Sequence, residues 1–239
     1  MITGIYDLQP SSDYKVRIVA EDEQACIEIK TDEEFVTLNV RDFGAKGDGI
    51  TDDTLFIQSA IMACPKKGRV LIPEGTYKVT SLFLKDDLNL ELAQGAVLSA
   101  ETDRRKFPIY PGLIQSWDET EEYNLGTWEG NPLPMFSAII TGVNVKHVVI
   151  YGKGVIDGNA NFDEDNWWYQ PKVKRIAFRP RMLFLNHCED VLLPPSEGFL
   201  SSVVCESSFD TLSDGFFPGS VLLCVFLGFT VTVTIVSDA

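Results

Sequence analysis

Short apolar segments, separated by small turns and with no helix between them, dominate the middle of this sequence. Strand-like runs of three to five residues recur in RVLIPEGTYKV, SLFLKDDLNLELAQGAVLSA, FSAIITGVNVKHVVIYGKGVIDG and RPRMLFLNHCEDVLL. Two of these stretches align with each other, LNLELAQGAVL with HVVIYGKGVID, because each holds a strand, a small turn with glycine and a second strand. A recurrence of roughly 20–25 residues predicts an all-β chain folded as a parallel β-helix, whose coils bury their apolar faces against one another.

An antiparallel β-sandwich is the structural alternative for the same runs. Tight-hairpin signals such as Asn-Gly are missing from the sequence, which favours the β-helix. The segment 51–64, TDDTLFIQSAIMAC, predicts an amphipathic helix that ends before Pro65 and caps the first coil. Its apolar residues at helical spacing are Leu55, Ile57, Ile61 and Met62.

Four aspartates lie in the loop before this helix, RDFGAKGDGITDDT. Adjacent carboxylates serve acid–base catalysis, but they also serve the starts of helices. Thr51 or Asp52 occupies the expected N-cap position, and Asp52 and Asp53 would meet the positive end of the helix dipole. We therefore interpret this loop as part of the cap and not as a catalytic centre.

Residues 1–34 alternate in the manner of short strands, as in YKVRIVAED and ACIEIKTDE. Before them, LQPSSDY places Leu8, Pro10 and Tyr14 in a spacing that resembles the tyrosine corner of fibronectin type III sandwiches. This resemblance implies a partial β-sandwich segment, and a simple edge hairpin is the alternative.

Residues 192–239 differ in composition from the rest of the chain and contain no Lys, Arg or His. We expect an atypical apolar tail outside the β-helix, produced by a shifted reading frame, a truncated gene or an unrelated sequence. Its run 221–236, VLLCVFLGFTVTVTIV, is shorter than the roughly 20 residues of a bilayer helix and has no basic flank. A buried strand pair or a non-native tail is therefore favoured over a membrane anchor.

The composition excludes several classes of function. A net charge of −15 argues against nucleic-acid partners and anionic membranes, because both attract basic surfaces. Five scattered cysteines without a CxxC pair, and only two histidines, His147 and His187, predict no metal site. The start of the chain shows no basic and apolar leader, so we expect a cytoplasmic protein.

The order of the motifs in residues 35–191 resembles glycoside hydrolase family 28, the polygalacturonases that degrade pectin. The motifs are FVTLNVRDFGAKGDGITDDTLFIQSAI, RVLIPEGTYKV, LNLELAQGAVL, GKGVIDGN with a Trp pair, and RPRMLFLNHCEDV. The resemblance implies a right-handed β-helix, of which this chain would hold the first coils. It also implies inverting hydrolysis of α-1,4-galacturonosidic bonds by two carboxylic groups, without metal or cofactor.

The catalytic motifs of that family are missing from the sequence. The resemblance would require an N-T-D, a D-D, a G-H-G and an R-I-K after the RPR region, and none is present. LSDGFF is the nearest imitation, so Asp214 is the one weak catalytic candidate. We therefore expect a truncated and inactive fragment of a polygalacturonase-like hydrolase.

A basic cluster and two tryptophans are the candidate substrate-binding residues. In QPKVKRIAFRPRM, the candidates are Lys174, Arg175, Arg179 and Arg181. Guanidinium groups bind carboxylates bidentately, which suits an acidic polysaccharide or oligogalacturonate. Trp167 and Trp168 could stack on a sugar face. The alternatives are a loop that pairs with its acidic neighbours and tryptophans that only pack.

Two functional hypotheses follow. The first is a polygalacturonase-like enzyme fragment, and the second is a non-catalytic β-helix that binds pectin or oligogalacturonate. The oligomeric state cannot be read from the sequence.

Overall fold

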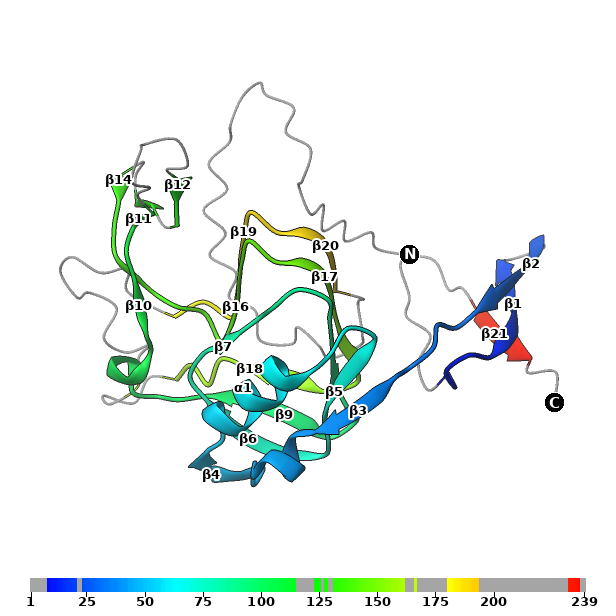
Figure 1. The fold of residues 1–239 in the computed structure, drawn as a ribbon, viewed down its shortest axis with the longest axis horizontal. Helices are drawn as coiled ribbons and strands as arrows, with labels where there is room; N and C mark the ends of the chain where they lie inside the picture. Colours follow the sequence, from blue (N-terminus) through cyan, green and yellow to red (C-terminus); the bar gives the residue numbers. More distant parts are fainter. Residues whose placement is uncertain are drawn as a thin grey trace.

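Three parallel sheets wind around one apolar core in the computed structural model (Figure 1). The structure describes residues 8–20, 23–114, 123–125, 127–128, 131–161, 166, 180–193 and 232–236. Every pair of neighbouring strands within the three sheets is parallel. The parallel β-helix is thus confirmed, and the antiparallel sandwich is wrong for this region.

Successive coils contribute strands to the three sheets in turn, and in the first coil α1 follows β4 in place of a sheet III strand. Sheet I has the order β20-β17-β8-β5-β3 and contains β3 (Val36–Asn39), β5 (Gly68–Ile72), β8 (Leu88–Leu92), β17 (Lys146–Gly152) and β20 (Glu189–Leu192). Sheet II has the order β18-β9-β6-β4 and contains β4 (Asp48–Asp52), β6 (Gly75–Val79), β9 (Ala96–Ala100) and β18 (Val155–Asp157). Sheet III has the order β19-β16-β7 and contains β7 (Leu82–Phe83), β16 (Ile140–Val143) and β19 (Leu183–Asn186).

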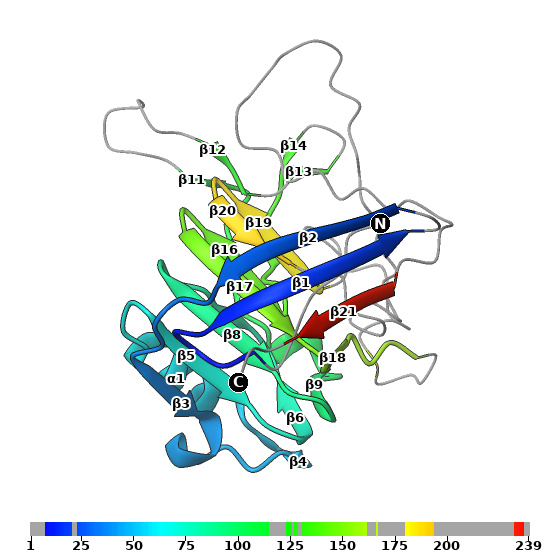
Figure 2. The same cartoon turned by 90° about the vertical axis from the view of Figure 1, so that its right-hand side faces the viewer.

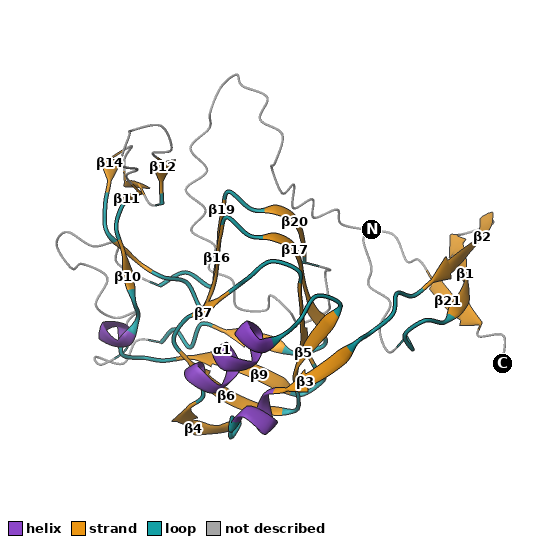
Figure 3. Ribbon diagram, in the orientation of Figure 1, coloured by secondary structure: helices purple, strands orange, loops and turns teal. Residues whose placement is uncertain are grey.

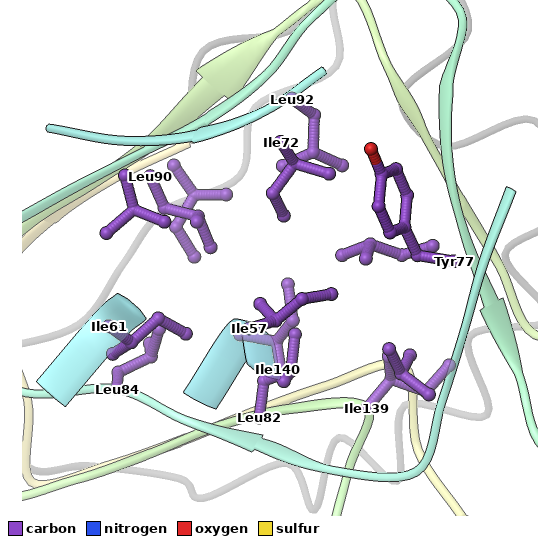
Figure 4. Close-up of a cluster of buried hydrophobic side chains, with 14 of the residues drawn as sticks. Ile57, Ile61, Ile72, Tyr77, Leu82, Leu84, Leu90, Leu92, Ile139 and Ile140 are labelled. Carbon is purple, nitrogen blue, oxygen red and sulfur yellow. The ribbon is translucent and has the colours of Figure 1, made fainter. Parts of the chain in front are cut away.

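The core consists of apolar side chains stacked in register from coil to coil. In sheet I, Val70 pairs with Leu90, and Leu90 pairs with Ile150. All three are fully buried, and Figure 4 shows Leu90 and other aliphatic residues facing the interior from different strands. Alternation along each strand sends every second residue inward, so one coil covers the apolar face of the next.

Helix α1 (Thr54–Ala63) covers the first coil, as expected, and ends ahead of Pro65. In Figure 3 it lies inside the outline formed by β5, β6 and β7. Ile57 and Ile61 are buried against the coils, whereas Leu55 and Met62 are 77% and 61% exposed. Of the four apolar residues at helical spacing, Leu55 and Met62 therefore face away from the core.

The start of α1 also differs from the expectation by one residue. The N-cap is Asp53, whose carboxylate makes no capping hydrogen bond and instead accepts the backbone N–H groups of Lys46 and Gly47 at 2.7 and 2.9 Å. Asp52 accepts the Thr54 N–H at 3.0 Å. Both carboxylates stabilise the cap. The short 3₁₀ helix η1 (Val40–Phe43) precedes them and is part of the same cap.

Gln58 of α1 closes the first edge of sheet III. Its side-chain amide donates to the Phe83 carbonyl at 2.9 Å and accepts the Phe83 N–H at 2.7 Å. These are the two kinds of hydrogen bond that a neighbouring strand would supply to β7. The exposed edge of a sheet is thus satisfied by one side chain of the cap.

A column of left-handed residues marks the turn into sheet I. The φ angle lies between 52° and 62° at Lys67, Asp87, His147 and Asp190. Strand register places these residues at equivalent points of successive coils. His147 Nδ1 lies 3.0 Å from Asp190 Oδ2, so this histidine pairs along the corner at the surface. The column gives each coil the same sharp bend.

A separate antiparallel sheet contains β1 (Asp13–Ala20), β2 (Glu23–Lys30) and β21 (Thr232–Val236). Figure 2 shows β1 between the other two strands. The Tyr14 hydroxyl accepts the Gln9 N–H at 2.7 Å, which is the link to upstream backbone expected of a tyrosine corner. Of the run 221–236, only β21 is described, and no helix within the described ranges has the length and apolar character to span a membrane.

The long connection between β9 and β16 contains small local structures. They are η2 (Arg104–Lys106), β10 (Ile109–Tyr110), β11 (Leu113–Ile114), β12 (Tyr123–Asn124), β13 (Thr127–Trp128), β14 (Asn131–Pro132) and β15 (Met135–Phe136). They pair antiparallel as β10 with β15, β11 with β12, and β13 with β14.

We predict that Leu90→Ala lowers the free energy of unfolding by about 2–5 kcal/mol, because it opens a cavity between stacked coils. Leu55→Ala is the matched control, since Leu55 is exposed on α1. Urea unfolding followed by circular dichroism measures both variants. Equal effects of the two substitutions would contradict the stacked core.

We predict that Gln58→Ala lowers the free energy of unfolding by about 1–3 kcal/mol, because it leaves the Phe83 backbone groups without their partners. Ser59→Ala on the exposed side of the same helix serves as control. Amide exchange at Phe83 should become faster in the Gln58 variant alone. Unchanged exchange would show that another group closes this edge.

Candidate functional site

All connections from sheet II to sheet III leave the coils at one corner. These connections are the short link at residues 80–81 and the long segments 101–139 and 158–182. We call this region the II–III corner. Long insertions on a rigid stack are where binding and catalytic residues are commonly placed, so this corner is the candidate functional site.

Glu101 is a charged residue buried at the start of the first long connection, and its side chain is 5% exposed. It accepts hydrogen bonds from Lys106 Nζ at 2.6 Å, Lys78 Nζ at 3.0 Å and the Asp103 N–H at 3.1 Å. Burial by itself would raise the pKa of Glu101, but these donors outweigh it and lower the pKa to about 2. Glu101 therefore anchors the connection as a permanent anion.

Two carboxyl groups of this corner, those of Glu101 and Asp103, have pKa values below the range of a general acid. An acid catalyst in glycoside hydrolysis needs a raised pKa so that it holds a proton near neutral pH. Hydrogen bonding from Arg105 lowers the pKa of Asp103 to about 2. Among the described residues, every carboxyl pKa with a resolved shift is lowered, namely those of Asp48, Glu101, Asp103 and Glu189.

Adjacent aspartates elsewhere in the coils also have structural partners. Asp86 Oδ1 accepts the Lys146 N–H at 2.8 Å, and Asp87 Oδ1 lies 3.1 Å from Lys66 Nζ. Asp52 and Asp53 belong to the cap of the first coil. Asp86 and Asp87 lie away from the II–III corner, whereas Asp52 pairs in register with Lys78 at the end of sheet II, and the Asp53 N–H donates to the Lys78 carbonyl beside this corner.

Of the binding residues expected from the sequence, Arg181 lies within the described residues, two positions before Leu183, where β19 begins. Its guanidinium Nη1 donates to Met135 Sδ at 3.4 Å, and its Cζ lies 5.6 Å from the centre of the Phe184 ring. Burial lowers the pKa of Arg181. The other candidates lie outside the described residues: Lys174, Arg175, Arg179, Trp167, Trp168 and Asp214.

Aromatic side chains stand on the outward face of sheet III. Leu82 and Leu84 point into the core, so Phe83 between them projects outward (Figure 4). The register Phe83–Thr141–Phe184 places Phe184 in the same row. The Tyr110 ring meets Phe83 edge-on, with 6.0 Å between ring centres.

Sequence reasoning missed Glu101 and the aromatic row. The available signal for Glu101 was the dense charge of ETDRRK directly after a strand. For the aromatic row, the signal was a Phe at the same position of two strands, in LFLKD and in LFLNH. Among the described residues, no group of three or more His, Cys, Asp or Glu side chains could hold a metal ion.

We predict that Glu101→Gln destabilises the protein at pH 7 by up to about 3 kcal/mol, because the folded state favours the ionised carboxyl. The pKa lies near 2 in the folded chain against 4.5 ordinarily, so this stability is present above pH 4.5 and disappears as the pH falls toward 2. Thermal unfolding of the wild type and of Glu101→Gln, measured from pH 7 to pH 3, should show that the difference in stability between them becomes smaller.

The control for this measurement is Glu28→Gln, whose carboxylate is 80% exposed beside Lys15. Its stability should match that of the wild type at every pH. If the difference in stability between the wild type and Glu101→Gln stays constant with pH, the packing of the side chain and not its charge stabilises the protein.

Known proteins match the coil region. The sequence model of the family described as rhamnogalacturonase A/epimerase, pectate lyase-like, matches residues 37–91. An exo-poly-alpha-D-galacturonosidase of Dickeya chrysanthemi is 36% identical over 126 residues, which are 51% of this chain and 19% of that protein. The plasmin and fibronectin-binding protein A of Streptococcus pneumoniae is 46% identical over 118 residues, 43% of this chain and 16% of that protein.

A solved structure agrees with these sequence matches. The family 28 exopolygalacturonase of Yersinia enterocolitica superposes with a TM-score of 0.55 and 26% identity, covering 78% of this chain and 40% of that one. This chain therefore spans less than half of the relatives named above. The neighbouring folds are right-handed parallel β-helices, which confirms the expected fold class. This chain is therefore similar over part of its length to polygalacturonases, including one of family 28, and its coils share their parallel β-helix fold.

Proposed function

We propose that this chain is part of a polygalacturonase-like glycoside hydrolase that acts on pectin. The observation that carries the proposal is the 36% identity to an exo-poly-alpha-D-galacturonosidase over half of the chain. The substrate of such a protein is an acidic polysaccharide, and the reaction is hydrolysis of α-1,4-galacturonosidic bonds.

The mechanism we propose for the complete catalytic unit is inversion by two carboxylic groups. One group protonates the glycosidic oxygen, and the other activates a water molecule from the opposite side of the sugar. The two groups stand roughly 6.5–9.5 Å apart so that the water fits between them. We propose that this chain alone does not perform the reaction, because the N-T-D, D-D, G-H-G and R-I-K motifs are absent after the RPR region.

A second candidate function is binding of pectin or oligogalacturonate without cleavage. The missing N-T-D, D-D, G-H-G and R-I-K motifs favour this function for the chain as it stands. The II–III corner would then serve as a recognition surface, with guanidinium groups facing the uronate carboxylates.

Two measurements on the full chain test these functions. Release of reducing ends from polygalacturonate measures cleavage, and isothermal titration calorimetry with tri-galacturonate measures binding. We predict binding without new reducing ends. A neutral galactotriose is the matched ligand control and should bind at least about tenfold more weakly, because it lacks the carboxylates.

Other outcomes are equally informative. Release of reducing ends would contradict an inactive chain, and loss of that activity in Asp214→Asn would then identify the acid candidate. The absence of both binding and cleavage would contradict any pectin-directed function for this chain.

A further inference from the structure

Charged residue pairs of alternating sign lie along the turn into sheet I. Each pair lies at or just before the start of a sheet I strand, and strand register places the pairs of successive coils next to one another. In chain order the pairs are Glu33–Glu34, Lys66–Lys67, Asp86–Asp87, Lys146–His147 and Glu189–Asp190. Acidic and basic pairs thus alternate along all five strands of sheet I, and the first and last pairs are both acidic. We call this set of pairs the charge ladder.

Opposite charges of neighbouring coils contact each other in the first part of the charge ladder. Lys67 Nζ lies 3.6 Å from Glu33 Oε2, and Lys66 Nζ lies 3.1 Å from Asp87 Oδ1. Ion pairs near the surface add little stability by themselves. Like charges placed opposite each other are destabilising, however, so the alternation selects which strand edge fits beside which.

The last step of the charge ladder joins β17 to β20, which are neighbours in Figure 1. Lys146 Nζ lies 2.6 Å from Glu189 Oε2, and His147 Nδ1 lies 3.0 Å from Asp190 Oδ2. Hydrogen bonding from Lys146 lowers the pKa of Glu189, so this carboxylate is anionic at neutral pH. The coil beneath therefore fixes the position of the last acidic pair.

This last acidic pair is also exposed to solvent. The side chains of Glu189 and Asp190 remain 65% and 74% exposed although both are paired with residues of β17. Leu192 on the same strand is 56% exposed. Among the strands that the structure describes, β20 is the last in the order of sheet I. A strand in such a position can accept a further strand through main-chain hydrogen bonds.

The alternation specifies the charge of that further strand. A basic pair would continue the charge ladder, whereas an acidic pair would place like charges opposite each other. Residues 192–239 contain no Lys, Arg or His, so a basic pair has to come from outside them. A second copy stacked head to tail would bring Glu33 and Glu34 against the acidic pair of β20, so the charge ladder disfavours that occupant.

We propose that the edge of β20 is a docking surface for an extended basic strand of another polypeptide. Two adjacent basic residues of this strand lie opposite Glu189 and Asp190. Main-chain hydrogen bonds supply most of the affinity, and the charge pair supplies selectivity and register. The inference is independent of the proposed function, because it concerns the turn into sheet I and not the II–III corner.

Fluorescence anisotropy of labelled peptides with the full chain tests this surface. The peptide PKKGRVLIP copies residues 65–73, whose basic pair contacts an acidic pair on either side within the charge ladder. At pH 7 and low salt, the wild type should bind this peptide at least about fivefold more tightly than the same peptide with Lys66→Glu and Lys67→Glu. Salt of about 1 M should reduce the preference, because it screens exposed charges.

The double variant Glu189→Gln with Asp190→Asn should reduce this preference to about twofold or less. Asp13→Asn with Glu28→Gln is the matched control, since it removes two carboxylates that are 81% and 80% exposed on the separate antiparallel sheet. The control changes the net charge equally and should keep the full preference. Asp190→Asn alone retains the Lys146–Glu189 pair and should show an intermediate preference. Unfolding temperatures measured without peptide show whether each variant retains the fold.

The contrary results are equally specific. Equal binding of the two peptides by the wild type would overturn the docking surface. So would a preference that survives Glu189→Gln with Asp190→Asn, or one that falls as much in the control variant, because either result indicates a general attraction of cations to an acidic chain. Sedimentation that shows copies of the wild type associating, with no dissociation when the basic peptide is added, would make a second copy the occupant and overturn the proposal.

Discussion

Stacking of apolar side chains between coils is the interaction on which the rest of this structure depends. A single coil has no interior of its own, so Leu90 becomes buried only because Val70 and Ile150 lie in register on either side. This dependence makes strand register the main constraint on the chain. Insertions are tolerated only where they leave the stack, and the long ones leave it at the II–III corner.

The repeat in the sequence predicted much of this register. The stretches LNLELAQGAVL and HVVIYGKGVID align in the structure almost as they align by eye, with Leu88 beside Val148 and Val97 beside Val155. Spacing was predicted less well, because a recurrence of roughly 20–25 residues applies to the step from β5 to β8 and fails where α1 or a long connection intervenes. The role of Gln58 could not be predicted, since it depends on where α1 meets an edge that forms only after folding.

The candidate site was only partly accessible from sequence. Arg181 was selected because basic residues cluster around it, but its lack of a carboxylate partner among the described residues is a property of three-dimensional packing. Glu101 shows the opposite case, because its burial among lysines depends on strand β6 and a loop that are distant from each other in the chain. Patterns along a chain report local geometry well, whereas the balance of charges at a corner depends on segments brought together by folding.

The closure of β7 by Gln58 gives the stack a polarity. One end is finished by a side chain of α1, so the first coil can be completed from residues that lie close together in sequence. Each later coil then finds a template of paired backbone groups already in place. A chain built in this way can assemble vectorially during its synthesis, with the cap leaving the ribosome before the coils and acting as the seed on which the following turns form.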